Sequence, residues 1–173
     1  TDPNKYCECI DDNTAPNCKS KNINLYLDDI GQANLNATQI DNGSADNCST
    51  VTLMLEGQTS FNCSNIGQNS VALVVSDQSN NVSFCEAFIT VIDTIKPQCN
   101  GFILNKTIQS NGIVTFTANE LDNKSYDICG NISLSASENM LTCLDLDKIN
   151  IVILTVTDQS GNSSSCPVEV KLT

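Results

Sequence analysis

The sequence predicts an all-β protein built from two tandem β-sandwiches, and three observations predict it. Short segments alternate apolar and polar residues, which is the two-residue period of a strand with one buried face. Clusters of Gly, Asn, Asp and Ser separate these segments, as turns do. A pattern of four cysteines occurs twice in the 173 residues. We therefore expect one small β fold to be present in two copies.

The duplication is visible when the sequence is aligned with itself at an offset of 81 positions. The phrase DQSNNVSFC (77–85) then falls on DQSGNSSSC (158–166). Three cysteine pairs coincide at this offset and a fourth at 80: Cys18 with Cys99, Cys48 with Cys129, Cys85 with Cys166, and Cys63 with Cys143. The expected domains are an N-terminal extended segment at 1–11, a first repeat at 12–92, a linker at 93–98 and a second repeat at 99–173.

Each copy contains short strand-like segments in the same order. No stretch has a convincing helical period, and Asn111-Gly112 is a strong signal for a two-residue hairpin. This pattern is typical of an immunoglobulin-like sandwich. The expected strands of the first copy are INLYL (23–27), VTLML (51–55), VALVV (71–75) and AFITVI (87–92), and those of the second include ISLSA, VILTV and VEVKL.

The repeated DQSxN phrase predicts a hairpin loop between two long strands. An Asp that opens a turn accepts hydrogen bonds from backbone N–H groups, and Gly or Asn tolerates a positive φ. The alternative is a calcium loop at Asp77 and Asp158. Such a loop needs carboxylates at alternate positions, which are absent here. We therefore expect turn chemistry and predict no metal site.

Composition excludes several classes of function. The formal net charge is −12, which disfavours binding to nucleic acid or to an anionic membrane surface. No window approaches the roughly 18 apolar residues that span a bilayer. Ten cysteines occur with no histidine and no CxxC, which favours disulfides over a zinc site. We expect an oxidising location, either extracellular or at the cell surface.

Four cysteines in each copy allow three pairings. A hairpin at Glu56-Gly57 would place Cys48 beside Cys63, and parallel first and last strands would bring Cys18 and Cys85 together. Each bond would contribute roughly 2–4 kcal/mol. The core has no Trp and is thin, so the fold needs this contribution. The predicted disulfides are Cys18–Cys85, Cys48–Cys63, Cys99–Cys166 and Cys129–Cys143.

These motifs resemble hyalin repeats, which are immunoglobulin-like modules of extracellular adhesive and matrix proteins. The resemblance covers nearly all of 12–173 and is carried by P-x-C, by Asp-Asn-Cys at 46–48, by Phe-Asn-Cys at 61–63 and by the D-x-x-x-N turn. The second copy departs from it, with Asp-Ile-Cys at 127–129 and Leu-Thr-Cys at 141–143. The resemblance implies a structural or adhesive role, usually within a longer array.

Cys7 and Cys9 are left over, in the phrase YCECIDD. One intervening residue makes a bond between them strained, so they are candidates for links to another subunit; pairing elsewhere in the chain, or reduced thiols, are the alternatives. The first ten residues resemble the closing strand of a preceding copy. Such a strand could pair with the exposed sheet edge of a neighbour, which would give head-to-tail polymerisation.

Asparagine is abundant, and many asparagines begin a glycosylation sequon. If the source is eukaryotic we expect covalent N-glycans, although Asn and Ser also recur because turns favour them. The nine sequons begin at Asn36, Asn42, Asn47, Asn62, Asn81, Asn105, Asn123, Asn131 and Asn162.

No enzymatic activity is expected. Without histidine there is no imidazole base, and no phosphate-binding Gly-rich loop is present. We predict no catalytic residue and no cofactor. The first hypothesis is a glycosylated extracellular structural protein, a subunit of a fibre, coat or matrix array assembled with itself head-to-tail through the N-terminal strand. The alternative is a cell-surface adhesin or receptor segment that binds carbohydrate or other surface proteins through its loops.

Overall fold

The computed structural model describes residues 12–173. The chain divides into two compact units, the first ending at Asp93 and the second covering Thr94–Thr173. Both units consist of strands with only single-turn helices, so the predicted all-β class is confirmed. The predicted N-terminal segment, with Cys7 and Cys9, lies outside the described residues.

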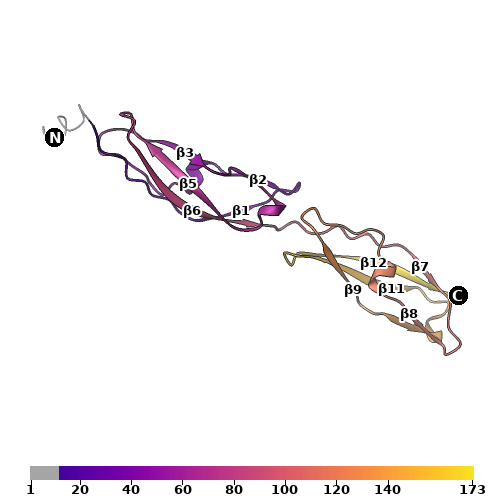
Figure 1. The fold of residues 1–173 in the computed structure, drawn as a ribbon. Helices are drawn as coiled ribbons and strands as arrows, with labels where there is room; N and C mark the ends of the chain where they lie inside the picture. Colours follow the sequence, from indigo (N-terminus) through magenta and orange to yellow (C-terminus); the bar gives the residue numbers. More distant parts are fainter. Residues whose placement is uncertain (1–11) are drawn as a thin grey trace. The chain divides into compact units, whose positions relative to one another are not determined.

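The first unit is built on a four-stranded sheet in the order β1-β6-β5-β3 (Figure 1). β5 and β6 form a long antiparallel hairpin, β3 pairs antiparallel with β5, and β1 runs parallel to β6. The first and last strands of the unit are therefore parallel neighbours. The bounds are β1 Ile23–Tyr26, β3 Thr52–Glu56, β5 Gly67–Ser76 and β6 Val82–Ile92.

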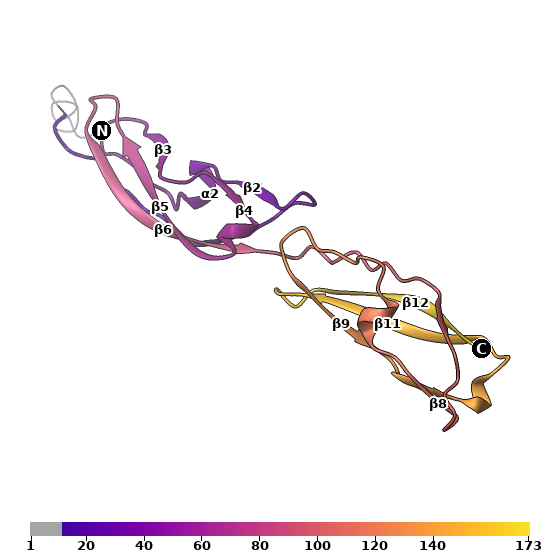
Figure 2. The same ribbon diagram turned by 45° about the vertical axis from the view of Figure 1, so that its right-hand side comes forward.

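A second layer covers the inner face of this sheet. It consists of the antiparallel pair β2 and β4 with two single-turn helices, and Figure 2 shows β2, β4 and α2 together across from β5 and β6. Gln39 forms a capping box with Asn36 at the start of α2. The bounds are β2 Gln32–Asn34, α2 Ala37–Ile40, β4 Ser60–Asn62 and the 3-10 helix η1 Cys63–Asn65.

The second unit repeats this architecture with a four-stranded sheet in the order β7-β12-β11-β9 and the pair β8-β10. β7 runs parallel to β12, and the other pairs are antiparallel. The bounds are β7 Leu104–Lys106, β8 Ile113–Thr115, α3 Ala118–Leu121, β9 Ile132–Ala136, β10 Met140–Thr142, η2 Cys143–Asp145, β11 Asn150–Asp158 and β12 Ser163–Leu172.

The inner faces of the two layers form the core of each unit. In β5 the buried residues Val71, Leu73 and Val75 occupy alternate positions, which is the periodicity that predicts the strand. The second unit has its own cluster, which includes Val152, Leu154 and Val156. Each unit therefore has a separate aliphatic core, consistent with two independent sandwiches.

At one place in the core, the two units contain the same two kinds of side chain, Leu and Phe, at exchanged positions. Leu35 and Phe61 are buried in the first unit, and Phe116 and Leu141 are buried at the equivalent positions of the second. Phe61 and Leu141 lie in β4 and β10, while Leu35 and Phe116 stand one residue after the paired strands β2 and β8. The large ring moves from one of these neighbouring segments to the other, which keeps the total core volume constant.

A second exchange lies near the first strand of each unit. A Cβ atom on Gly101 would lie 2.3 Å from Cγ2 of Val168. The equivalent residues of the first unit are Ser20 and Ala87. The second unit thus combines Gly with the larger Val, and the first combines Ser with the smaller Ala.

The hairpin that Asn111-Gly112 predicts is absent, and this expectation is wrong. Gly112 does have a positive φ of 76°, as a tight turn requires. The strands on either side belong to different layers, however, because β7 pairs with β12 and β8 pairs with β10. The turn therefore carries the chain from one sheet to the other.

Candidate functional site

One disulfide joins the first and last strands of each unit. Cys18 is bonded to Cys85, and Cys99 is bonded to Cys166, with a Cα–Cα distance of 5.8 Å in both. These are the two pairs predicted from parallel first and last strands, and the parallel pairing of β1 with β6 and of β7 with β12 explains them. Such bonds indicate an oxidising location.

The predicted bond between Cys129 and Cys143 is wrong. Cys143 is an exposed free thiol, whereas Cys129 is disulfide-bonded. Cys143 begins η2, and its backbone N–H donates to the carbonyl of Gly112 at 3.0 Å. Among the described cysteines of the second unit, Cys143 is therefore the one free thiol.

The predicted bond between Cys48 and Cys63 is also wrong, although each of these cysteines is disulfide-bonded. Next to Cys48, Ser49 accepts a hydrogen bond from the backbone N–H of Gln78, at the tip of the β5–β6 hairpin. Cys63 contacts the carbonyl of Gly31, at the opposite end of that hairpin. The two ends are roughly 30 Å apart along β5, far beyond the Cα separation that a disulfide allows.

The physical reason for this error is the path of the chain after β3. The expected hairpin at Glu56-Gly57 requires β3 and β4 to be antiparallel neighbours. Instead β3 pairs with β5 in one sheet, and β4 pairs with β2 in the other. The chain crosses between layers and continues in the same direction, so it carries Cys63 away from Cys48.

The DQSxN phrases form the predicted turns between the long strands. Asp77 is buried; its Oδ1 accepts from the backbone N–H of Asn81 at 2.8 Å, and its Oδ2 accepts from the Asn81 amide at 2.8 Å. Asp158 and Asn162 make the same two bonds in the second unit. Both carboxylate oxygens are thus used within the turn, which is the structural role that the sequence indicates.

Glycosylation at the nine sequons stays a prediction, and the structure separates them into two groups. Asn81 and Asn162 are half-buried, and their amide nitrogens hydrogen-bond within the turns. A glycan on that nitrogen would remove a donor, so these two are the poorest sites. The other seven side chains are exposed: Asn36, Asn42, Asn47, Asn62, Asn105, Asn123 and Asn131.

An apolar row crosses the outer face of the first unit's large sheet. Met54 pairs with Val74, and Val74 pairs with Phe84, so the three side chains are cross-strand neighbours. Met54 is 62% exposed and Phe84 is 61% exposed. Exposed contiguous apolar surface is typical of an interaction site. We call Met54, Val74 and Phe84 the apolar row.

Acidic residues border the apolar row on one side. The next cross-strand row on the same face is Glu56, Ala72 and Glu86, and both glutamates are exposed. Glu86 accepts a hydrogen bond from the hydroxyl of Ser70. The face therefore presents the apolar row with negatively charged glutamates along one side.

The second unit has hydroxyl groups where the first has the apolar row. Thr155 pairs with Ser135 on β9 and with Ser165 on β12, in the same register. The hydroxyls of Thr155 and Ser165 are hydrogen-bonded to each other at 2.9 Å. This polar row is well solvated and gives no reason for association.

A shallow hollow of about 320 Å³ lies on the same unit as the apolar row. Its lining combines the ring of Phe88, which is 39% exposed, with the amide side chains of Asn22, Asn24 and Gln68. An aromatic ring bordered by amides suits a sugar, which presents an apolar face and hydroxyl groups.

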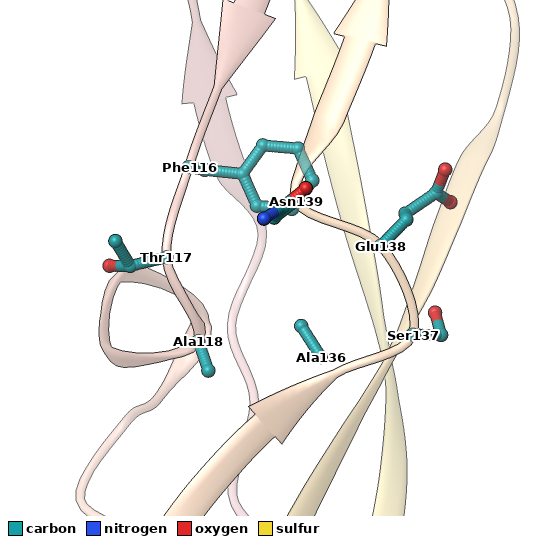
Figure 3. Close-up of a pocket in the computed structure, with 7 residues that line it drawn as sticks. All are labelled: Phe116, Thr117, Ala118, Ala136, Ser137, Glu138 and Asn139. Atoms are coloured by element: carbon teal, nitrogen blue, oxygen red, sulfur yellow. The ribbon is translucent and has the colours of Figure 1, made fainter.

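The second unit has a hollow of about 490 Å³ between α3 and the connection from β9 to β10. Figure 3 shows that Thr117 and Glu138 point away from the ring of Phe116. Glu138 is the one ionisable residue of its lining, which also includes Ala118, Ala136, Ser137 and Asn139. The lining therefore combines one carboxylate with the hydroxyl groups of Thr117 and Ser137.

No protein-family model matches the sequence, so the resemblance to hyalin repeats stays a prediction. No curated protein matches it either. Within residues 12–173, no helix is both long enough and apolar enough to cross a membrane.

Several solved structures are similar to the chain. A human protocadherin-24 structure (EC1-2) is 12% identical, covers 93% of this chain and 99% of its own, and has a TM-score of 0.49. Drosophila N-cadherin EC1-4 is 13% identical, covers 92% of this chain and 50% of its own, and scores 0.46. An endo-fucoidan hydrolase is 18% identical, covers 100% of this chain and 29% of its own, and has a TM-score of 0.33. At these identities and scores, no activity, ligand or partner is transferred to this chain.

Proposed function

We propose that the chain is a non-enzymatic segment of an extracellular adhesin or receptor, and that its first unit binds a protein partner through the apolar row. The single observation that carries this proposal is the contrast between Met54–Val74–Phe84 and the hydroxyl row at the same positions of the second unit. One scaffold thus has two different outer faces. The difference lies in solvent-facing residues, which the fold does not require to be apolar.

Charge identifies the kind of partner. Glu56 and Glu86 border the apolar row, and the whole chain carries −12. Two identical faces would bring like charges together, which is unfavourable. The complementary surface has an apolar centre and a border of Lys or Arg. The partner is therefore a different protein, not a second copy of this chain.

Photo-crosslinking tests this proposal. A benzophenone amino acid placed at Phe84 should form adducts with proteins extracted from the surface of the source cells. The same amino acid at Ser165, the matched position of the second unit, should form few. Equal adduct yields at both positions, or adducts at Phe84 that consist only of a second copy of this chain, would overturn the proposal.

The hollow around Phe88 favours a second candidate function, binding of carbohydrate. Substitution of Phe88 by Ala should weaken binding to a glycan array and leave the protein adducts at Phe84 unchanged. The converse variant, Phe84→Ala, should weaken protein binding alone. An array on which the wild type and Phe88→Ala bind equally would exclude the carbohydrate function at this hollow.

The head-to-tail fibre of the first hypothesis depends on residues 1–11, which lie outside the described residues. The described residues favour the adhesin alternative, since they include an exposed apolar face and no feature specific to polymerisation. Binding through a sheet face also replaces the loop binding that the sequence suggests.

A further inference from the structure

We propose that Asp12 and Asp46 form a binding site for Ca²⁺ at the end of the first unit where the β5–β6 hairpin turns. This pair is distinct from Asp77, which the turn uses fully. One carboxylate oxygen of Asp12, one of Asp46 and Sγ of Cys48 lie within 4.8 Å of one another.

The first support is a buried carboxylate with an unused oxygen. Asp12 is only 8% exposed. Its Oδ1 accepts from the backbone N–H of Thr14 at 3.0 Å, whereas its Oδ2 is buried and has no hydrogen-bond partner. A buried charged oxygen without a partner is costly, so a group that satisfies it is expected.

The second support is the matching oxygen on Asp46. Its Oδ2 accepts from the backbone N–H groups of Cys48 at 2.9 Å and Ser49 at 3.0 Å, and its Oδ1 is buried without a partner. Asp12 and Asp46 therefore each have one buried carboxylate oxygen that a cation would satisfy.

The geometry suits a calcium ion. Ca²⁺ lies about 2.3–2.6 Å from its oxygen ligands, so one ion fits between oxygens up to about 5 Å apart. The ion would also remove the repulsion between the two carboxylates. No lysine does this, because the ion pairs found among residues 12–173 involve neither Asp12 nor Asp46. Cys48 is disulfide-bonded, so its sulfur is not a thiolate that would select zinc.

The unused oxygen of Asp46 recurs in the second repeat. Asp127, 81 positions after Asp46, accepts from the N–H of Cys129 at 2.7 Å through Oδ2, and its Oδ1 is again buried without a partner. The same side chain is thus held in the same way in both copies.

The ion would connect the segment at Asp12 to the turn between β5 and β6. The carbonyl of Asp12 accepts from the amide of Asn81 at 2.9 Å, which already connects it to that turn. Two aspartates supply only part of the six to eight oxygens that Ca²⁺ takes, so water completes the shell. Affinity in the range of about 10⁻⁴–10⁻³ M, typical of extracellular modules, is expected.

The test is calorimetric titration of the chelator-treated full chain with CaCl₂, together with its thermal unfolding. We expect heat of binding and a higher Tm in Ca²⁺. Asp46→Asn should lower the stoichiometry by one equivalent of Ca²⁺. The amide oxygen can still accept from the N–H groups of Cys48 and Ser49, but the negative charge that would bind the ion is removed. Asp28→Asn is the matched control: Asp28 Oδ1 accepts from Ile30 and Gln32 N–H groups at the other end of the unit, and binding should be unchanged.

Three outcomes would overturn the proposal: no heat and no Tm shift in the wild type, an unchanged stoichiometry in Asp46→Asn, or a response to Zn²⁺ without one to Ca²⁺. If Asp46→Asn fails to fold, Asp12→Asn gives the same test, because its amide oxygen can still accept from Thr14.

Discussion

The two units share a fold and differ in what they present to solvent. Their cores exchange side chains at constant volume, as Leu35 with Phe61 against Phe116 with Leu141 shows. Their outer faces differ at one matched row, which is the apolar row in the first unit and a row of hydroxyl groups in the second. Exchange of side chains in the core preserves its packing. Substitution of solvent-facing side chains on the sheet leaves the fold intact and changes which surface is offered to a partner. The proposed difference in binding between the two units therefore rests on their outer faces.

The largest expected effect comes from the disulfide that both units share. Replacing Cys18 and Cys85 together by Ala should destabilise the first unit by roughly 2–4 kcal/mol, because the unfolded chain loses a cross-link. The same change at Cys99 and Cys166 should destabilise the second unit by a similar amount, since both bonds close 67 residues. Hydrogen exchange reports on each unit separately. Exchange that rises in both units for either variant would contradict two independent cores.

The core exchange predicts a rescue. Phe61→Leu should cost about 1–3 kcal/mol by leaving a cavity beside Leu35. Leu35→Phe added to it reproduces the arrangement of the second unit and should recover most of the loss. Denaturant unfolding of the two single variants and the double variant gives the coupling energy. Additive losses would show that the two side chains do not share one space.

The close approach at Gly101 predicts a similar rescue. Gly101→Ser should destabilise the second unit by about 1–3 kcal/mol, because the new Cβ meets Val168. Val168→Ala restores the combination of the first unit, Ser20 with Ala87, and should recover part of that stability. Thermal unfolding of the single and double variants checks this. A Gly101→Ser chain as stable as the wild type would show that the backbone can move apart.

Acid should affect the second unit through an ion pair that the first lacks. Lys106 Nζ lies 2.6 Å from Glu120 Oε1, and this hydrogen bond lowers the pKa of Glu120. The stabilisation is present above the unfolded pKa of about 4.3 and is lost as pH falls through the lower folded value. The first unit has uncharged Gln39 at this position. Glu120→Gln should therefore reduce the loss of Tm between pH 6 and pH 3, and an unchanged loss would contradict this role.

The smallest expected effect on stability is at the free thiol. Cys143 is exposed and unbonded, whereas its counterpart Cys63 is disulfide-bonded. A maleimide should add at Cys143 of the folded chain with little change in Tm. Peptide mapping by mass spectrometry identifies the labelled residue, and Cys143→Ser is the control. Absence of label at Cys143 under native conditions would contradict its exposure.

The sequence predicts the repeat, the long strands and the DQSxN turns, because these depend on local chemistry and on a period of two. It also predicts the bonds Cys18–Cys85 and Cys99–Cys166, which follow from parallel first and last strands. It fails at Cys48 and Cys63, because a turn at Gly57 is compatible with either a hairpin or a crossing between layers. Only the pairing of β3 with β5 and of β4 with β2 distinguishes the two.

The apolar row could not be predicted from the sequence, because it also depends on which strands pair. Met54, Val74 and Phe84 each occupy an outward position of an alternating segment, but they are ten to thirty residues apart. Their alignment depends on the cross-strand register, which a single sequence does not fix. The unused oxygens of Asp12 and Asp46 likewise appear only when distant loops meet.

Exchanging the outer rows between the units tests the central claim most directly. One variant carries Met54→Ser, Val74→Thr and Phe84→Ser, and its reciprocal carries Ser135→Met, Thr155→Val and Ser165→Phe. Adhesion of beads coated with each chain is measured on cells of the source organism. The account predicts that the first variant loses adhesion, with an unchanged Tm, and that the reciprocal variant keeps it. Adhesion by the first variant equal to that of the wild type would contradict the account.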